Sequence, residues 1–270
     1  MRGRCIVALA VALAAWSPAT ARSIPQHATG PGVPQSGAWF GAFVGLGDHT
    51  GWDRRTAVTG FEAAIGRTLA LERVYYFWDQ PFPTADDAWS RDQGRTLVLD
   101  WSARLSDQST FTRWADIADG LYDDVIDQRA AALAAFGAPV YFSFDHEPER
   151  WVDKEGDPKA GTTEDFVRAW QHIHDRFAAD GATNVSYVLT LIARTYTLGN
   201  EDLYDPGDAY VDFLGADGYN WYGCPAHDGP WLSFQNIFAE FHGYGMARGK
   251  PMMILEYGSQ EDPAIPGRKA

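Results

Sequence analysis

The segment "PVYFSFDHEPER" (residues 139–150) decides the fold, because an aromatic and apolar run ends there in titratable side chains. Gly137 and Pro139 just before it are typical of a helix end followed by a new element. The run "PVYFSFDHE" (139–147) predicts a strand whose aromatic and apolar part is buried. Asp145, His146, Glu147 and Glu149 then follow within five positions. A strand that leaves the core into such residues indicates a functional site at its carboxyl end.

Six further strand-like runs flank this segment, separated by stretches of helical or polar character. They are "AWFGAFVGL" (38–46), "LALERVYYFW" (69–78), "RTLVLDWSA" (95–103), "NVSYVLTLIA" (184–193), "DFLGADGYNW" (212–221) and "KPMMILEYGS" (250–259). Helices are predicted over 53–67, 111–136, 162–177 and 231–247 by their apolar spacing. Residues 79–95 are polar and contain a Pro-x-Pro turn.

Alternating strands and helices predict an α/β fold with a parallel sheet. The absence of GxGxxG and of a P-loop argues against nucleotide-binding folds. Seven such units in one chain of 270 residues predict a (β/α)8 TIM barrel, truncated after strand seven. The tail "QEDPAIPGRKA" (260–270) has the character of an interrupted seventh helix. We therefore expect a gap between strands one and seven that exposes apolar side chains.

The first residues have the character of an export signal. "MRGR" is basic, "CIVALAVALAAW" is apolar, and "ATA" (19–21) is a small-residue cleavage site. The apolar run is too short to span a bilayer, which needs about 20 residues. The sequence predicts a signal peptide over 1–21, a flexible leader over 22–37, and a catalytic barrel over 38–270 of a secreted protein, with no membrane contact after cleavage.

The charge balance excludes some partners. A formal net charge of −14 disfavours binding to nucleic acid and to anionic lipid. A neutral substrate such as a polysaccharide fits this charge. The chain has 11 Trp, 12 Tyr and 15 Phe, which suit either a large core or a surface for flat apolar faces.

Two glutamates at strand ends are the candidate catalytic residues. Glu147 ends the fourth strand and Glu256, in "ILEYGS", ends the seventh. In a (β/α) barrel these ends face each other at the mouth, where active sites lie. A carboxylate pair about 5–5.5 Å apart is the geometry of retaining glycoside hydrolysis, and mutual repulsion raises the pKa of one member. The structural alternative for Glu256 is a carboxylate that caps a loop or pairs with an arginine.

Three motifs carry a family resemblance. "FSFDHEPE", "FLGADGYNWYG" and "PMMILEYGS" resemble the active-site strands of glycoside hydrolase family 26, in clan A. The resemblance covers most of residues 38–259. It implies a β-mannanase-like enzyme, with Glu147 as acid/base, Glu256 as nucleophile, and Tyr219 as the tyrosine that hydrogen-bonds the nucleophile. His146 stands where the family has histidine.

Aromatic and polar residues near strand ends are candidate sugar contacts. His146, Tyr219, Trp221, Trp78 and Trp101 are the predicted substrate-binding residues, because sugar rings stack on aromatic faces. Each has an alternative in simple core packing. Further candidates for hydrogen bonds to sugar are Asp48, His49, Asp79, Asp100 and Arg194.

Asp145 and Glu149 have a structural role by expectation: they cap a loop, or pair with Arg150 or Lys154. No metal or other cofactor is expected, since His172 and His174 are two apart on a helix and do not share a face. GxSxG is absent, so a serine-hydrolase elbow is not indicated.

The sequence favours an endo-acting hydrolase of β-1,4-mannan or a related β-glycan. Two alternatives stay open: an endo-β-glucanase of the same clan, and a non-hydrolysing carbohydrate-binding relic whose barrel is incomplete. A complete barrel of this kind is expected to be a monomer.

Overall fold

The computed structural model describes residues 11–13, 30–45, 53–225, 229–262, 264–265 and 267–268. Within these ranges, no helix is long and apolar enough to cross a membrane.

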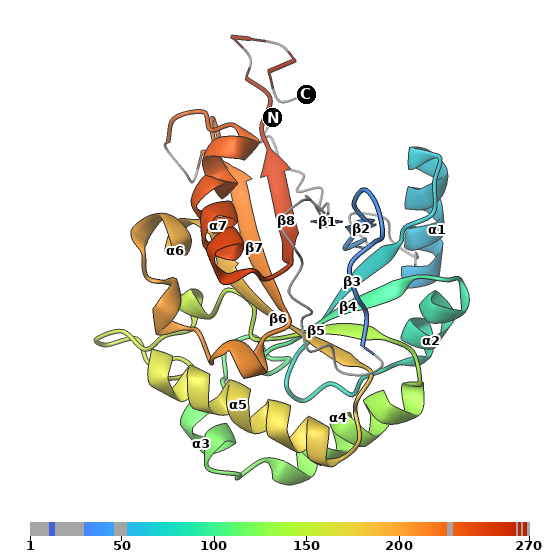
Figure 1. Ribbon diagram of the computed structural model, residues 1–270, viewed down its shortest axis with the longest axis vertical. Coiled ribbons are helices and arrows are strands. Elements are labelled where there is room, and N and C mark those ends of the chain that lie inside the picture. Colours follow the sequence, from blue (N-terminus) through green and yellow to red (C-terminus); the bar gives the residue numbers. More distant parts are fainter. Residues whose placement is uncertain are drawn as a thin grey trace.

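Seven parallel strands form the wall of the molecule and follow one another in sequence order (Figure 1). They are β2 (Phe40–Ala42), β3 (Leu71–Tyr76), β4 (Thr96–Trp101), β5 (Val140–Phe144), β6 (Val185–Ile192), β7 (Phe213–Asn220) and β8 (Met252–Ser259). Each lies inside a strand range predicted from the sequence. The predicted class, an α/β barrel with seven parallel strands, is confirmed.

A short eighth strand, β1 (Val11–Leu13), lies between β2 and β8 and runs antiparallel to both. Ala12 is paired with Phe40 on one side and with Ile254 on the other. The prediction of a gap between the first and last parallel strands is therefore wrong. β1 pairs with the free edges of β2 and β8 and closes the ring. β1 falls within residues 1–21, for which the signal peptide stays a prediction.

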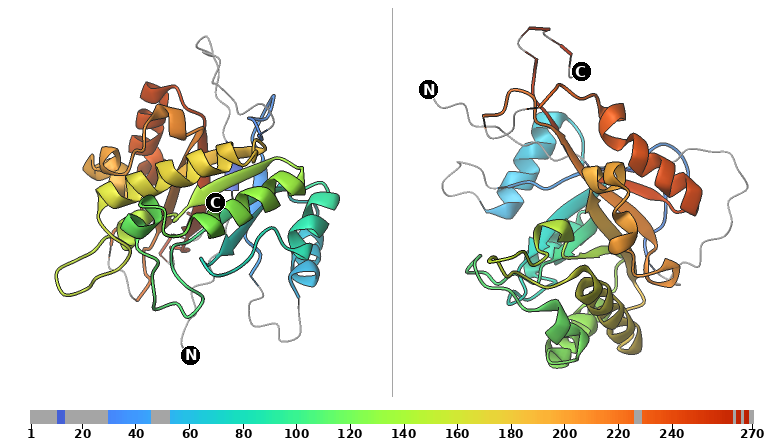
Figure 2. Two further views of the ribbon diagram at one scale, coloured as in Figure 1. Left: turned by 90° about the horizontal axis from the view of Figure 1, so that it is seen from below. Right: turned by 90° about the vertical axis from the view of Figure 1, so that its left-hand side faces the viewer.

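The helices surround this ring on its outside (Figure 2). They are α1 (Arg54–Ile65), α2 (Ala85–Asp92), α3 (Trp114–Ala118), α4 (Asp123–Phe136), α5 (Thr163–Ala179), α6 (Ala193–Leu198) and α7 (Phe234–Arg248). The helix predicted over 111–136 is two helices, since Gly120 between them has φ 82°, a left-handed conformation. Single 3₁₀ turns lie at η1 (Pro148–Arg150), η2 (Glu201–Leu203) and η3 (Asp208–Tyr210).

Helix α2 lies within the polar residues 79–95, for which no helix was predicted from the sequence. Its start is a capping box, in which the Thr84 hydroxyl accepts from the backbone of Asp87 and the Asp87 carboxylate accepts from the backbone of Thr84. Thr162 and Asp165 form the same motif at the start of α5. A Thr-x-x-Asp signal was thus present at α2 as well.

Side chains alternate along each strand and divide the core in two. On β4, Leu97, Leu99 and Trp101 belong to the large cluster between strands and helices, whereas Val98 belongs to the cluster inside the ring. The inner cluster comprises Leu71, Val98, Tyr141, Val188, Phe213, Met253 and Leu255. These apolar side chains fill the inside of the ring in place of a pore.

Residues from the predicted leader lie against the inner face of the strands. The Tyr141 hydroxyl donates to the carbonyl of Gly32 at 2.5 Å, and the Ser186 hydroxyl donates to that of Pro31 at 2.9 Å. Gly30 lies so close that a Cβ there would be 2.5 Å from the Ser186 oxygen. The described part of the leader therefore contacts the barrel.

Candidate active site

A β-bulge in β8 places Glu256 inside the ring. Met253 and Leu255 point inward, so simple alternation would send Glu256 outward. The pairing with β7 shifts at this point: Ala216 is opposite Ile254, and Asp217 is opposite Glu256. Leu255 is the extra residue, and the side chains after it change faces. The Glu256 carboxylate therefore joins the inward groups of the neighbouring strands.

The Glu256 carboxylate is held by three neighbours from two other strands. The Tyr75 hydroxyl donates to Oε1 at 2.6 Å, and the Tyr219 hydroxyl donates to Oε2. The Arg73 guanidinium lies 3.2 Å from Oε1. Burial raises the pKa of Glu256, but the charge of Arg73 and these hydrogen bonds outweigh it, and the net pKa is lowered. Glu256 is thus an ionised, oriented carboxylate at neutral pH.

Arg73 is the centre of a buried charge network. It is 1% exposed, donates to Asp100 Oδ2 at 2.6 Å, and lies 3.4 Å from Asp217 Oδ1. Burial, which outweighs the attraction of Arg73, raises the pKa of Asp217 well above its ordinary value, and Glu256 acts in the same direction. Asp217 therefore binds a proton more readily than Glu256 does.

Glu147 lies beyond the end of β5 in a turn with unusual backbone conformation. Asp145 has φ 48° and Glu147 has φ 52°, both in the left-handed region that non-glycine residues seldom adopt. The Glu147 N–H donates to the carbonyl of Thr190 on β6 at 3.0 Å. Arg150 donates to the Glu147 carboxylate at 3.0 Å. Such strain is typical of functional sites.

The two glutamates belong to one group of side chains. Tyr219, which hydrogen-bonds Glu256, has its pKa raised by burial and by the negative charges of Glu256 and Glu147. The charges of both glutamates also raise the pKa of Asp217. The structure thus brings the predicted pair to the same end of the barrel, while their catalytic roles and separation stay predictions.

His146 connects the two sides of this group. Its Nε2 is 4.0 Å from Glu256 Oε1, and its Nδ1 is 3.6 Å from Asp100 Oδ1. Its ring lies 5.1 Å from that of Tyr75. The side chain is 23% exposed, so it is accessible from the mouth and is not a core histidine.

Trp78 and Trp101 are core residues, and the prediction that they bind sugar is corrected here. Their rings stack at 4.1 Å, and they are 4% and 0% exposed. Trp101 faces the helix layer, since Asp100 next to it faces the inside. The sequence placed both at strand ends correctly but could not tell which face each ring takes.

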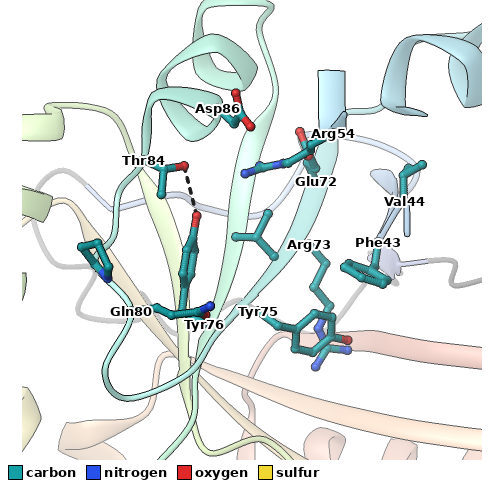
Figure 3. Close-up of a pocket in the computed structure, with 12 residues that line it drawn as sticks. Phe43, Val44, Arg54, Glu72, Arg73, Tyr75, Tyr76, Gln80, Thr84 and Asp86 are labelled. Atoms are coloured by element: carbon teal, nitrogen blue, oxygen red, sulfur yellow. Dashed lines mark hydrogen bonds and ion pairs between the residues drawn. The ribbon is translucent and has the colours of Figure 1, made fainter. Parts of the chain in front are cut away.

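Trp221 remains a candidate sugar platform. It is partly exposed, and its ring lies 4.7 Å from that of Tyr219 at 33°. A second exposed aromatic, Phe43, lies 5.0 Å from the ring of Tyr75. Phe43 and Tyr75 line a pocket of about 390 Å³ beside β3, together with Arg54, Glu72, Gln80 and Asp86 among others (Figure 3).

Three side chains of the site are of kinds that can bind a metal ion, but a charged arginine side chain already lies among them. Ligand atoms of His146, Asp217 and Glu256 lie within 4.8 Å of one another. Arg73 is within 3.4 Å of both carboxylates and supplies positive charge there. The arrangement favours an ion-pair network over a metal centre.

Several residues of the site were not predicted. Arg73 and Tyr75 lie in "LERVYY", where alternation places them with Leu71 on one face, and that signal was available. Of the remaining candidates, Asp100 belongs to the site, Asp79 accepts hydrogen bonds from Ser106, and Arg194 is exposed on α6. Asp48 and His49 lie outside the described residues.

The fold and this centre define an α/β barrel with a cluster of carboxylates at the carboxyl ends of its strands. Among the solved structures that share this fold are the following two. The family 26 glycoside hydrolase domain of an endo-β-mannanase/endo-β-glucanase from Prevotella bryantii has a TM-score of 0.56 at 16% identity, over 79% of this chain and 75% of that one. A β-mannanase from a symbiotic protist of the termite Reticulitermes speratus, complexed with gluco-manno-oligosaccharide, has a TM-score of 0.53 at 17% identity, over 84% and 74%.

The resemblance to glycoside hydrolase family 26 is thus confirmed at the level of the fold. A curated relative, Endoglucanase H of Acetivibrio thermocellus, is 30% identical over 244 residues. The match covers 87% of this chain and 25% of the relative, so the chain spans about a quarter of the relative's length. No family model matches the chain.

Proposed function

We propose that the chain is a secreted glycoside hydrolase that cleaves β-1,4-mannan or a related β-glycan internally, with retention of configuration. The observation that carries the proposal is the bulge in β8, which aims an ionised Glu256 at the same mouth as Glu147. Two glutamates at these strand ends are the minimum that double displacement requires.

Glu256 is the proposed nucleophile. Its oxygen attacks the anomeric carbon, a glycosyl–enzyme ester forms, and the bond to the leaving sugar breaks. Tyr75 and Tyr219 hold the carboxylate from both oxygens, which fixes its direction of attack. The charge of Arg73 keeps the Glu256 carboxylate ionised, and Arg73 itself gives up no proton at neutral pH.

Glu147 is the proposed acid and then base. It donates a proton to the departing glycosidic oxygen, and in the second step takes one from the water that hydrolyses the ester. His146, Tyr219 and Trp221 surround the sugar at the cleavage point in this scheme. The polysaccharide is the only partner proposed, and no cofactor takes part.

The sugar itself is the open choice within the proposal. Endo-β-glucanase activity is the second candidate, and the name of the relative that is 30% identical favours it. A carbohydrate-binding protein without turnover is the third.

One assay separates the three. Reducing ends released from β-mannan, β-glucan and xylan identify the substrate, and Glu147→Gln serves as the matched variant. It should lower release by about 10²–10⁴-fold, since general acid catalysis contributes that much. A nitrophenyl glycoside, which needs no proton donor, should still be cleaved. Binding to a polysaccharide without release of reducing ends would support the third candidate and refute hydrolysis.

A further inference from the structure

We propose that Glu149 is the positioning residue of Glu147: its carboxyl group ties the strained turn to the start of α6 and thereby fixes the acid/base. This rests on the proposed function of Glu147. The sequence predicted only loop capping or pairing with Arg150 or Lys154, and the structure shows Arg150 paired with Glu147 instead.

The contacts of Glu149 reach a different element from its own. Its Oε1 accepts from the backbone N–H of Ile192 at 2.9 Å and from the Thr195 hydroxyl at 2.5 Å. Ile192 is the N-cap of α6 and makes no side-chain cap itself. From the η1 turn, Glu149 therefore holds the N-cap residue of α6 through its backbone and Thr195 in the first turn through its side chain.

The other end of the same turn is held in a similar way. The buried Asp145 carboxylate accepts from Trp114 Nε1 at 2.6 Å, from the Ser102 hydroxyl at 2.8 Å and from the Ala103 N–H at 3.1 Å. The turn is thus tied to the end of β4 by Asp145 and to the end of β6 by Glu149. Glu147 lies midway between the two anchors, in its left-handed conformation.

These anchors balance the strain of the turn. A left-handed conformation at a non-glycine residue is unfavourable and persists only where the surroundings hold it. The hydrogen bonds to the Asp145 and Glu149 carboxyl groups provide that hold. Without the Glu149 anchor the turn relaxes and carries Glu147 with it, and a displacement of about 1 Å can cost about 100-fold in rate.

The test compares substrates that do and do not need an acid. Glu149→Ala should lower kcat/KM on polysaccharide by about 10–100-fold, and kcat/KM on a dinitrophenyl glycoside by less than about threefold. The reason is that kcat/KM reports the first step, in which only the polysaccharide needs Glu147 as proton donor. Glu149→Gln should have a kcat/KM on polysaccharide between those of wild type and Glu149→Ala, since an amide oxygen still accepts a hydrogen bond from Thr195. Thr195→Val should move in the same direction as Glu149→Ala and carries the test if that variant does not fold.

Two controls separate the possible failures. Asp165→Ala removes a capping box on α5, away from the site, and should affect both substrates equally. If Glu149→Ala and Thr195→Val also lower kcat/KM equally on both substrates, Glu149 is only a helix cap and the inference is overturned. If Glu147→Gln itself lowers kcat/KM on the dinitrophenyl glycoside as much as on polysaccharide, the proposed function is refuted instead.

Discussion

The two candidate glutamates are held by opposite means. Glu256 lies within a regular strand, turned inward by one bulge, with a guanidinium partner that is fully buried. Glu147 lies in a strained turn outside the strand, and its arginine partner is 59% exposed. The first environment is built from strand register and buried charge, the second from backbone conformation and loop anchors.

The difference suits two chemical tasks. A nucleophile must stay ionised and fixed, and a buried cation with two tyrosine hydroxyls achieves both. An acid/base must exchange a proton with sugar and water in each cycle, so a partner at the surface perturbs it less. The same residue type can therefore serve two roles at one site because the surroundings differ.

The largest expected effect is at the nucleophile. Glu256→Gln should lower kcat by at least about 10⁴-fold on polysaccharide and on nitrophenyl glycosides alike, because no glycosyl ester forms. A slow fluorinated glycoside should label a peptide that contains Glu256, as read by mass spectrometry. Labelling of another peptide would remove Glu256 from this role.

The two arginines offer a direct comparison of stability. Arg73→Met leaves buried carboxylates without their cation and should destabilise the fold by about 3–5 kcal/mol. Arg150→Met removes a partner at the surface and should cost less than about 1 kcal/mol. Denaturant unfolding at neutral pH measures both. Equal losses would show that the two pairs are not different in kind.

The tyrosines around Glu256 should have a smaller effect, on rate. Tyr75→Phe and Tyr219→Phe each remove one hydrogen bond to a carboxylate, worth about 1.5–3 kcal/mol, or about 10–100-fold in kcat. Activated and unactivated substrates should suffer alike, in contrast to the Glu149 variants. A loss confined to unactivated substrate would place these hydroxyls with the acid.

The smallest effect is in the pH dependence of stability. Burial raises the pKa of Glu149 to about 7, with the charge of Glu147 in the same direction and the hydrogen bonds from Thr195 and Ile192 opposed. Tyr196 and Tyr204 on the neighbouring segments are neutral in this range, and burial together with the charge of Glu149 raises the pKa of each.

Since an unfolded glutamate has a pKa of about 4.5, the native state binds the extra proton between about pH 4.5 and 7. Wild type should therefore lose stability relative to Glu149→Gln as the pH rises from about 5 to 8, on the order of 1–2 kcal/mol. Unfolding of both proteins at the two pH values measures this difference. A constant difference, or one of opposite sign, would show that Glu149 is ionised throughout.

Much of the architecture was predictable because its signals are local. Apolar runs bounded by helical spacing or Gly and Pro located all seven parallel strands, and the residues just after β5 marked Glu147. Glu256 was found in the same way, at a titratable position in an apolar strand. These features depend on neighbours along the chain, which the sequence displays directly.

What the sequence did not decide is which way several side chains point. Trp101 and Trp78 stack in the outer core, and Arg73 joins Glu256 from a strand nearly two hundred positions away along the chain. The inward direction of Glu256 depends on the bulge opposite Asp217. Strand pairing sets this register, and it arises only when β7 and β8 lie side by side. Local patterns therefore determined the elements and their ends, while the contacts between strands assembled the site.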